Sequence, residues 1–522
     1  MKHILVKENA MKSKKSSRHS KSIFVTLFGL LLLLCLASQD AFADESTVST
    51  TRDDEEAQGT LRQAINYANR NPGTTIHFDL PAFLAYQGVF RFKILRALPL
   101  ITASRTTIDG LTQREFRPLT PVIMLDGTNA GEANGLVIQG ASDCVIKGLI
   151  INNFLRNGIV LDSLDDHAVG GTPTETIITP ATRNRIVGCF IGTDATGEFA
   201  APNRWTGITL SGGARNNIIG GQLLYERNII SGNGQDGVFI SSSPGYVAGV
   251  ITSNNLVQGN FIGTNKEGNA ALGRGGNGGN GVSIWCGNRV GEPRGPQANV
   301  IENNVISGNV RSGVLISGRN TLENEVRSNL VGTTLRGDSA IPNGRDGVTL
   351  DRGAERNIIT RNTSGSPSVI AFNRGHGIRI RGGSIRNRIL GNSIFRNVWG
   401  GITLEQPQAG EVPPNHFQIA PTLTLVQINY DAGMNLSTIM INGNTNNASG
   451  PRLMLEFFAN ERSELPQGHT FVGSASAVTD AYGNFRQSLI VRGNFTQSRF
   501  TCTATSTLTD DTSAFSRGFP FP

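Results

Sequence analysis

A short apolar pattern recurs through the middle of the chain: a glycine, an apolar residue, any residue, and a second apolar residue. It occurs at intervals of 24 to 49 residues, starting at Gly158, Gly207, Gly237, Gly281, Gly313, Gly347, Gly377 and Gly401. A four-residue strand cannot bury its apolar face alone, whereas rungs stacked ~4.8 Å apart share one continuous core. The pattern therefore predicts a solenoid with rungs of roughly two dozen residues and loops of variable length.

Between these glycines lie short alternating strands that end in Asn or Gly, as in residues 227–233, 304–309 and 385–392. Asn and Gly tolerate the left-handed backbone angles of tight turns. Asn side chains stacked at equivalent turns can form hydrogen-bonded ladders, so we interpret the abundance of Asn as structural. A propeller or a conventional sandwich would need longer antiparallel strands. We therefore expect a parallel β-helix.

Three rungs carry a larger loop after a Gly-Thr step, in residues 191–194, 262–265 and 331–334. Their offsets of 71 and 69 residues predict that these loops protrude from one side of the solenoid. Insertions on one side of a repeat array commonly form a binding face.

The two ends of the array differ from its middle. Residues 59–69 predict an amphipathic helix, because Thr60 and Gln63 are spaced for a capping box and Leu61, Ile65 and Ala68 share one face. Such a helix would cap the open end of the core. After Pro413-Pro414, longer alternating runs at 422–428, 438–444, 453–460, 471–479, 484–491 and 500–508 predict a compact antiparallel sandwich.

The first 43 residues predict a secretory signal peptide: a basic stretch, an apolar run from Ile23 to about Leu36, and Ala41-Phe42-Ala43 before Asp44. The expected units are thus the signal peptide at 1–43, the β-helix at 44–412 and the sandwich at 413–522. Residues 1–43 carry a net charge of +5, so the remainder keeps only about +2 of the total +7. We expect an exported protein, whether extracellular, surface-bound or periplasmic, with no nucleic-acid partner and no transmembrane segment after cleavage.

The rungs resemble those of secreted right-handed parallel β-helix proteins, the pectate-lyase-like superfamily in its repeat-rich bacterial form. The segment 47–69, ending Gly-Thr-Leu-Arg-Gln-Ala, is similar to the segment that opens many such surface proteins, although Gly59-Thr60 and Gln63 replace the commoner Cys-Ser and Glu. Residues 455–460, 473–475, 479–484 and 503–516 resemble the Ig-like domain that often follows these helices. The resemblance implies an extracellular polysaccharide or cell-surface glycan as partner. It leaves the activity open, because the superfamily includes lyases, hydrolases, epimerases and adhesins.

The best catalytic candidates are Asp346, His376, Arg379 and Arg381. The run 375–381 resembles the Gly-His-Gly and Arg-Ile-Lys elements of polygalacturonases, but the carboxylate motifs of that family are not found at suitable spacing. Asp346 and His376 occupy equivalent positions on consecutive rungs, so we expect them to be neighbours, as an acid/base pair or as an ordinary ion pair. The interpretation that we favour is that His376 merely precedes an anchor glycine, as Asp236 does.

The middle residue of each anchor is expected to point outward and to form a mixed face suited equally to sugar contact and to solvent exposure. Its binding members are Thr209, Phe239, Ser283, Thr349, Arg379 and Thr403, with Val160 before Thr209 and Leu315 between Ser283 and Thr349. A further acidic cluster, Asp162, Asp165, Asp166 and His167, is either a calcium or sugar site or a polar loop. No cofactor is predicted apart from calcium as a candidate, the cysteines lack metal-site spacing, and the oligomeric state stays open. The leading hypothesis is non-catalytic binding or adhesion; the alternative is a polysaccharide lyase, hydrolase or epimerase.

Overall fold

The computed structural model describes residues 45–54, 57–114, 120–166, 177–242, 250–273, 275–286, 295–446, 453–461, 465 and 467–519, with the side chains of 165, 166 and 177 excepted. The predicted signal peptide lies outside these residues. Within the described residues, no helix is both long enough and apolar enough to cross a membrane.

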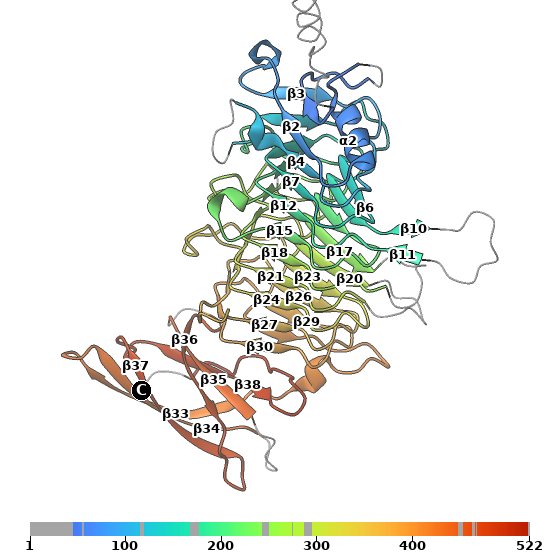
Figure 1. Cartoon of the computed structure of the whole chain (residues 1–522). Coiled ribbons are helices and arrows are strands. Elements are labelled where there is room, and N and C mark those ends of the chain that lie inside the picture. The colour runs from blue at the N-terminus through green and yellow to red at the C-terminus, as the bar shows by residue number, and fades with distance from the viewer. Residues whose placement is uncertain are drawn as a thin grey trace, which may run out of the picture.

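Three parallel sheets run along the chain and form a right-handed parallel β-helix, as expected (Figure 1). Sheet 1 contains β1 (Thr47–Val48), β2 (Thr75–Phe78), β4 (Thr107–Asp109), β7 (Val145–Lys147), β12 (Arg185–Val187), β15 (Ile218–Gly220), β18 (Leu256–Gln258), β21 (Val300–Glu302), β24 (Glu325–Arg327), β27 (Ile358–Thr360) and β30 (Arg388–Leu390).

The chain passes from sheet 1 to sheet 2 and then to sheet 3 in each complete rung. Sheet 2 contains β3 (Phe90–Lys93), β5 (Ile123–Asp126), β8 (Leu149–Asn152), β13 (Phe190–Ile191), β16 (Ile229–Ile230), β19 (Phe261–Ile262), β22 (Val305–Ile306), β25 (Leu330–Val331), β28 (Val369–Ala371) and β31 (Ser393–Phe395). Sheet 3 contains β6 (Leu136–Gln139), β9 (Ile159–Asp162), β14 (Ile208–Leu210), β17 (Val238–Ser242), β20 (Val282–Cys286), β23 (Val314–Ser317), β26 (Val348–Asp351), β29 (Ile378–Ile380) and β32 (Ile402–Leu404).

Smaller elements lie at the turns. A hairpin of β10 (Leu164–Asp166) and β11 (Ile177–Thr179) projects from the side of the solenoid (Figure 1). Short 3-10 turns occur at η1 (Ala82–Leu84), η2 (Gly110–Thr112), η3 (Leu224–Glu226) and η4 (Pro414–Phe417). Inward-facing Ile, Val and Leu side chains from all three sheets merge into one core that extends from Val48 to Ile402.

Asparagine ladders hold the corners of the solenoid, as the sequence predicted. In each ladder the side-chain Nδ2 of one Asn donates to Oδ1 of the Asn on the next rung, at 2.9 to 3.2 Å. These bonds satisfy buried polar groups where the backbone leaves a strand. The corner before sheet 1 uses Asn184, Asn217, Asn255, Asn299, Asn324, Asn357 and Asn387; the corner before sheet 2 uses Asn228, Asn260, Asn304 and Asn329; the corner before sheet 3 uses Asn203, Asn233, Asn277, Asn309, Asn343, Asn373 and Asn397.

The anchor glycines are required by close approach and not by backbone angle. A Cβ on Gly281 would lie 2.3 Å from Ile306 Cγ2, 2.7 Å from the Gly313 carbonyl oxygen and 2.9 Å from Asn309 Nδ2, whereas Gly281 is not a positive-φ residue. The same arrangement recurs at Gly237 and Gly347. Each anchor therefore admits only glycine, because the next rung packs directly on it.

The N-terminal end is closed by α2 (Leu61–Arg70), which confirms the predicted cap. The Thr60 hydroxyl accepts from Gln63 N at 3.2 Å, and Gln63 Oε1 accepts in return from Gly59 N, one residue before the usual partner of a capping box. Leu61, Ile65 and Ala68 are buried against the first rungs. Arg62, also buried, pairs with buried Asp53 at 2.9 Å.

The C-terminal residues form two three-stranded antiparallel sheets that share one apolar core and thus form a sandwich. One sheet contains β33 (Thr422–Asp431), β34 (Leu436–Asn444) and β37 (Asn484–Arg492), and the other β36 (Thr470–Ser476), β35 (Leu453–Asn460) and β38 (Arg499–Ser506). These strands match the predicted runs to within a few residues. The Ig-like relationship of this sandwich stays a prediction.

The sandwich lies at the C-terminal end of the β-helix (Figure 1). It continues the Asn ladder that precedes sheet 3. Gln467 Oε1 accepts from Asn397 N at 3.1 Å and takes the place of the next ladder Asn. Gly468 and Ile394 exchange two main-chain hydrogen bonds of 2.7 Å. Asp511 is buried at this junction and accepts from Arg386 N and His416 Nδ1.

Candidate functional site

The predicted outward row of sheet 3 is in strict register. Parallel pairing joins its members in the order Val160, Thr209, Phe239, Ser283, Leu315, Thr349, Arg379 and Thr403. Thr209, Phe239, Leu315, Arg379 and Thr403 are partly exposed. Ser283 and Thr349 are only 1% and 4% exposed, so they offer little surface to a ligand, contrary to the expectation of an open face.

Ser283 and Thr349 are covered by polar residues from the turn that precedes each strand. Asn280 Nδ2 donates to Ser283 Oγ at 3.1 Å. The Thr349 hydroxyl bonds to Asp346 Oδ2 and to Ser312 Oγ, both at 3.0 Å. This part of sheet 3 therefore carries an internal hydrogen-bond network in place of free polar groups.

A second row, which the sequence reasoning missed, lies on that turn. Its members stand two positions after each Asn of the ladder before sheet 3, and the backbone N–H of each donates to the carbonyl of the previous rung. We call this the turn ridge: Trp205, Gln235, Gly279, Arg311, Arg345, Gly375 and Trp399. The constant offset of four residues between ladder Asn and anchor glycine was a signal that could have found it.

Large exposed side chains stand along the turn ridge. Trp205 and Trp399 are 39% and 61% exposed, and Arg311 and Arg345 are exposed between them. The guanidinium of Arg156, on the preceding rung, lies 5.4 Å from the centroid of the Trp205 ring. Among the described residues, Arg345 has no ion-pair partner. Seven rungs at ~4.8 Å spacing make the ridge about 29 Å long.

The structure places Asp346, His376 and Arg379 together at the C-terminal end of sheet 3. Asp346 is buried, and its Oδ1 accepts from the main-chain N–H of His376 at 2.9 Å. Asp346 and His376 are therefore neighbours, as expected, but the hydrogen bond between them uses the backbone of His376 and not its ring. Arg379 Nη1 lies 3.9 Å from Asp346 Oδ2.

The two arginines are already paired with carboxylates that the sequence reasoning did not select. Arg379 forms a bidentate pair with Glu405, at 2.9 and 2.6 Å. Arg381 Nη2 donates to Asp351 Oδ2 at 2.9 Å. Asp351, Arg381 and Glu405 each follow the second apolar residue of an anchor, so rung alignment alone would have brought them together.

The His376 ring is half-buried, and it makes an edge-to-face contact with Trp399 at a centroid distance of 5.7 Å. Burial lowers the pKa of His376, an effect that the nearby Asp346 carboxylate opposes. The ring is therefore mainly neutral at neutral pH. A neutral imidazole beside an exposed tryptophan can accept a proton or contact a ligand.

The acidic cluster after the first anchor falls partly outside the described residues: His167 does, as do the side chains of Asp165 and Asp166. In the part of the chain that the structure describes, no group of three or more His, Cys, Asp or Glu side chains could hold a metal ion. Cys144, Cys189, Cys286 and Cys502 are buried and free of disulfides.

The chain belongs to the class of right-handed parallel β-helix proteins with a capping C-terminal sandwich. No family model and no curated protein matches its sequence. Similar solved structures include an alginate lyase from Paenibacillus sp. str. FPU-7, with 15% identity over 70% of this chain and 99% of the other and a TM-score of 0.31. The periplasmic alginate epimerase AlgG has 13% identity over 58% and 60%, with a TM-score of 0.26. ORF18 of Geobacillus virus E2 has 10% identity over 94% and 82%, with a TM-score of 0.36. At this level of similarity none of them assigns an activity to this chain.

Proposed function

We propose that this is an exported protein that binds an extracellular polysaccharide without cleaving it, and that the turn ridge with the adjoining exposed part of sheet 3 is the binding surface. The observation that carries the proposal is the straight row from Trp205 to Trp399, in which Arg311 and Arg345 are also exposed and only the glycines Gly279 and Gly375 are buried. Indole faces pack against the C–H faces of sugar rings, and guanidinium groups donate to sugar hydroxyls and carboxylates. Export rests on the predicted signal peptide at 1–43.

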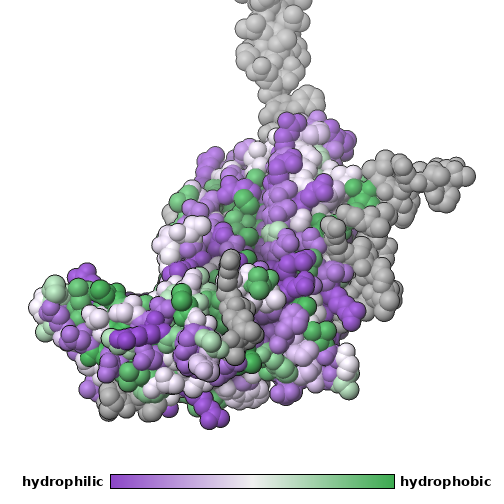
Figure 2. Space-filling model, turned by 90° about the horizontal axis from the view of Figure 1, so that it is seen from below, coloured by the Kyte–Doolittle hydropathy of each residue, from purple (hydrophilic) through white to green (hydrophobic). Residues whose placement is uncertain are grey.

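The ridge is rigid before any ligand arrives. Its backbone is hydrogen-bonded rung to rung, and the Asn ladder lies immediately behind it. A ligand therefore orders side chains but no loop, which lowers the entropic cost of binding. On the face seen from below, hydrophilic residues alternate with apolar residues in small groups (Figure 2).

Binding without catalysis is supported by the state of the carboxylates. Asp346 accepts a main-chain N–H and a hydroxyl, while Asp351 and Glu405 are each paired with an arginine. A general acid or nucleophile in polysaccharide cleavage needs a carboxyl that is free to exchange a proton or to attack. In this arrangement the three carboxylates hold the turn and its arginines in place.

A catalytic function is the second candidate, and the ring of His376 is the observation that favours it. That ring is largely neutral and faces the exposed Trp399 beside Arg379. A polysaccharide lyase or epimerase acting here would use His376 as the base and Arg379 to hold a substrate carboxylate. Arg379 would first have to leave Glu405.

A glycan array with residues 44–522 tests the proposal, and each bound glycan is then incubated with the protein, with and without calcium, for product analysis. We expect binding with intact glycan. Trp399→Ala and Arg345→Gln should each lower affinity at least about tenfold, whereas Arg319→Gln, an exposed arginine outside the ridge, should not. Cleavage or epimerisation that is lost in His376→Ala would overturn the proposal in favour of the enzyme. Binding that survives both ridge variants would place the site elsewhere.

A further inference from the structure

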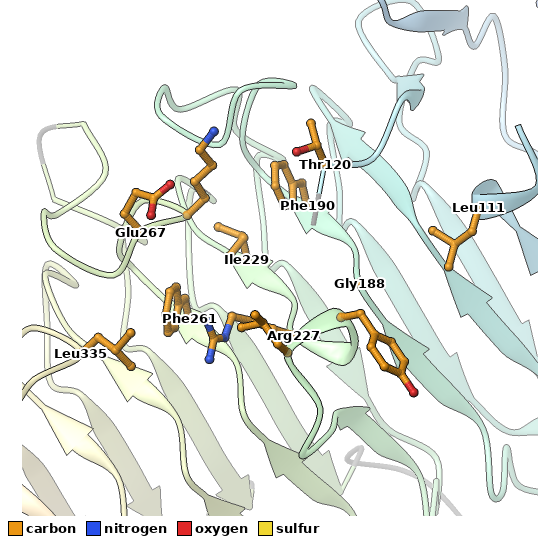
Figure 3. Close-up of a pocket in the computed structure, with 12 residues that line it drawn as sticks. Leu111, Thr120, Gly188, Phe190, Arg227, Ile229, Phe261, Glu267 and Leu335 are labelled. Carbon is orange, nitrogen blue, oxygen red and sulfur yellow. The ribbon is translucent and has the colours of Figure 1, made fainter. Parts of the chain in front are cut away.

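A hollow of about 540 Å³ lies on the outer face of sheet 2, on a different side of the solenoid from the strands of sheet 3 (Figure 3). Its floor is formed by Phe190, Ile229 and Phe261, which follow one another in register on β13, β16 and β19. Leu224 and Tyr225 of η3 form one wall, and Lys266 and Glu267 stand on the opposite loop. The floor and walls are largely apolar.

The Gly-Thr loops explain why this hollow exists. Each loop is closed by an isolated bridge, Thr193 to Ala200 in one and Thr264 to Ala271 in the next. Each also folds back over sheet 2, since a Cβ on Gly268 would lie 2.9 Å from the Phe261 ring. Consecutive loops bond directly, as in Lys266 N to Gly197 O at 3.1 Å. The loops thus protrude from one side, as the sequence predicted, and wall off part of the apolar stripe of sheet 2.

Arg227 is the polar group at the centre of the hollow. Its guanidinium carbon lies 4.0 Å from the centroid of the Phe261 ring, against which it lies in Figure 3. Nε donates to the Gly259 carbonyl at 3.2 Å. Stacking on a ring leaves the edge of the guanidinium, with its Nη groups, open to an in-plane partner.

No carboxylate of the described residues pairs with Arg227. Its neighbour Glu226 is held elsewhere: it accepts from Arg185 Nη2 at 2.5 Å and from Leu223 N at 3.1 Å. Burial lowers the pKa of Arg227, and no neighbouring charge of the described residues offsets this. The side chain nevertheless remains charged at neutral pH, because guanidinium groups lose their proton only under strongly basic conditions. A desolvated, unpaired cation on an apolar floor favours an anionic ligand.

We propose that this hollow binds a small organic carboxylate, with its flat apolar body against the exposed side chains of Leu224, Tyr225 and Leu335 and its carboxylate on the Nη groups of Arg227. At the rim, Lys266 carries a positive charge and Glu267 a negative one, so Arg227 is the group expected to hold the carboxylate. The volume lies within the range of small-ligand sites, roughly 300–1,000 Å³. This site is separate from the turn ridge and does not depend on the polysaccharide proposal.

The test uses residues 44–522 and 2-naphthoate as the probe, with its uncharged isostere naphthalene-2-carboxamide as the ligand control, by calorimetry or saturation-transfer NMR. We expect saturable binding of naphthoate and binding of the amide at least about tenfold weaker, because the charge-assisted pair with Arg227 is lost. Arg227→Gln should weaken naphthoate by a similar factor. Arg215→Gln removes an exposed arginine outside the hollow and should change affinity less than about twofold.

A second variant guards against misfolding of Arg227→Gln. Leu224→Glu changes an exposed position and supplies a carboxylate from the chain itself, so it should also weaken naphthoate. Thermal melting confirms that each variant is folded. Equal binding of the amide, unchanged binding by Arg227→Gln and Leu224→Glu, or no saturable binding at low-millimolar naphthoate would each overturn the proposal.

Discussion

The Asn ladder before sheet 3 should contribute measurably to stability, and Asn277→Ala tests this in the middle of the array. The Asn277 side chain makes four hydrogen bonds. Oδ1 accepts from Asn233 N and Nδ2 at 3.2 and 3.0 Å, and Nδ2 donates to Ile230 O at 2.9 Å and Asn309 Oδ1 at 3.0 Å. Alanine removes all four and leaves a small space in a buried corner.

The stability lost in Asn277→Ala depends on which hydrogen-bond partners of Asn277 keep another partner. Asn233 Nδ2 keeps Ile191 O, Ile230 O keeps Gly263 N, and Asn309 Oδ1 keeps the main-chain N–H of residue 277. Only the buried N–H of Asn233 loses its sole acceptor, which costs about 1–3 kcal/mol. The weakened bonds add roughly 1 kcal/mol, so we expect a loss of about 2–4 kcal/mol.

Urea unfolding followed by tryptophan fluorescence and far-UV circular dichroism measures this loss. The two probes must coincide for a single free energy of unfolding to apply, because repeat arrays can unfold in parts. Gln235→Ala is the matched control: it is exposed, lies two positions after ladder residue Asn233, and should change stability by less than about 0.5 kcal/mol. If Asn277→Ala costs no more than this control, the ladder does not stabilise the fold as argued.

Repetition explains how much of the structure the sequence could predict. A pattern such as Gly281-Val-Ser-Ile284 is ambiguous alone, but its recurrence places every copy on the same sheet, and the pairing of Ser283 with Leu315 follows from that alignment. The cap helix was predictable for a different reason: Thr60 and Gln63 carry a local signal that needs no tertiary context.

The C-terminal junction could not be predicted, because it joins residues from separate units that share no repeat. Gln467 continues an Asn ladder from the end of the sandwich, and Asp511 reaches Arg386 across 125 residues of sequence. The same limit applies to the candidate sites. Arg227 is a candidate ligand-binding residue because its neighbour Glu226 pairs with Arg185 instead, and local sequence spacing does not determine which arginine Glu226 pairs with.

Three further predictions concern burial. Gly281→Ala should lower the free energy of unfolding by about 1–3 kcal/mol, because the added methyl group overpacks against Ile306 and the next rung. In the same urea assay Gly433→Ala, where the nearest atom to the added Cβ lies 3.4 Å away, should lower it by less than about 0.5 kcal/mol, and equal effects would contradict the close-approach argument. Burial raises the pKa of Glu456 to about 7, above its unfolded value, so the contribution of this residue to stability is present at acid pH and is lost as pH rises through about 7. Glu456→Gln keeps an acceptor for Gly391 N and should raise the melting temperature at pH 8 but not at pH 4. An equal shift of the melting temperature at both pH values would refute the titration of Glu456. Burial raises the pKa of Cys144 and Cys189 to about 11 and about 12, so neither thiol should react with a disulfide reagent at pH 8 until guanidine unfolds the chain, and fast reaction of the native protein would show that they are accessible.

Equivalent positions in successive rungs form columns along the solenoid, and different columns serve the fold and the proposed binding surface. Between each ladder Asn and its anchor glycine stand three positions, and the flanking Asn and Gly are constrained by the neighbouring rungs, as Asn277 and Gly281 show. The second of the three positions carries a large side chain in some rungs, as Trp205, Arg345 and Trp399 show, while the backbone there stays hydrogen-bonded. At Gly279 and Gly375 it is crowded instead, because an added Cβ would lie 2.2 and 2.4 Å from a carboxylate oxygen of the preceding rung. The side chain at the third position covers the outer face of sheet 3, as Asp346 does when it accepts from the Thr349 hydroxyl. A ligand can therefore be recognised through the second column at little cost to the fold, which is why Trp399→Ala should lower affinity and leave stability nearly unchanged, the reverse of the result expected for Asn277→Ala.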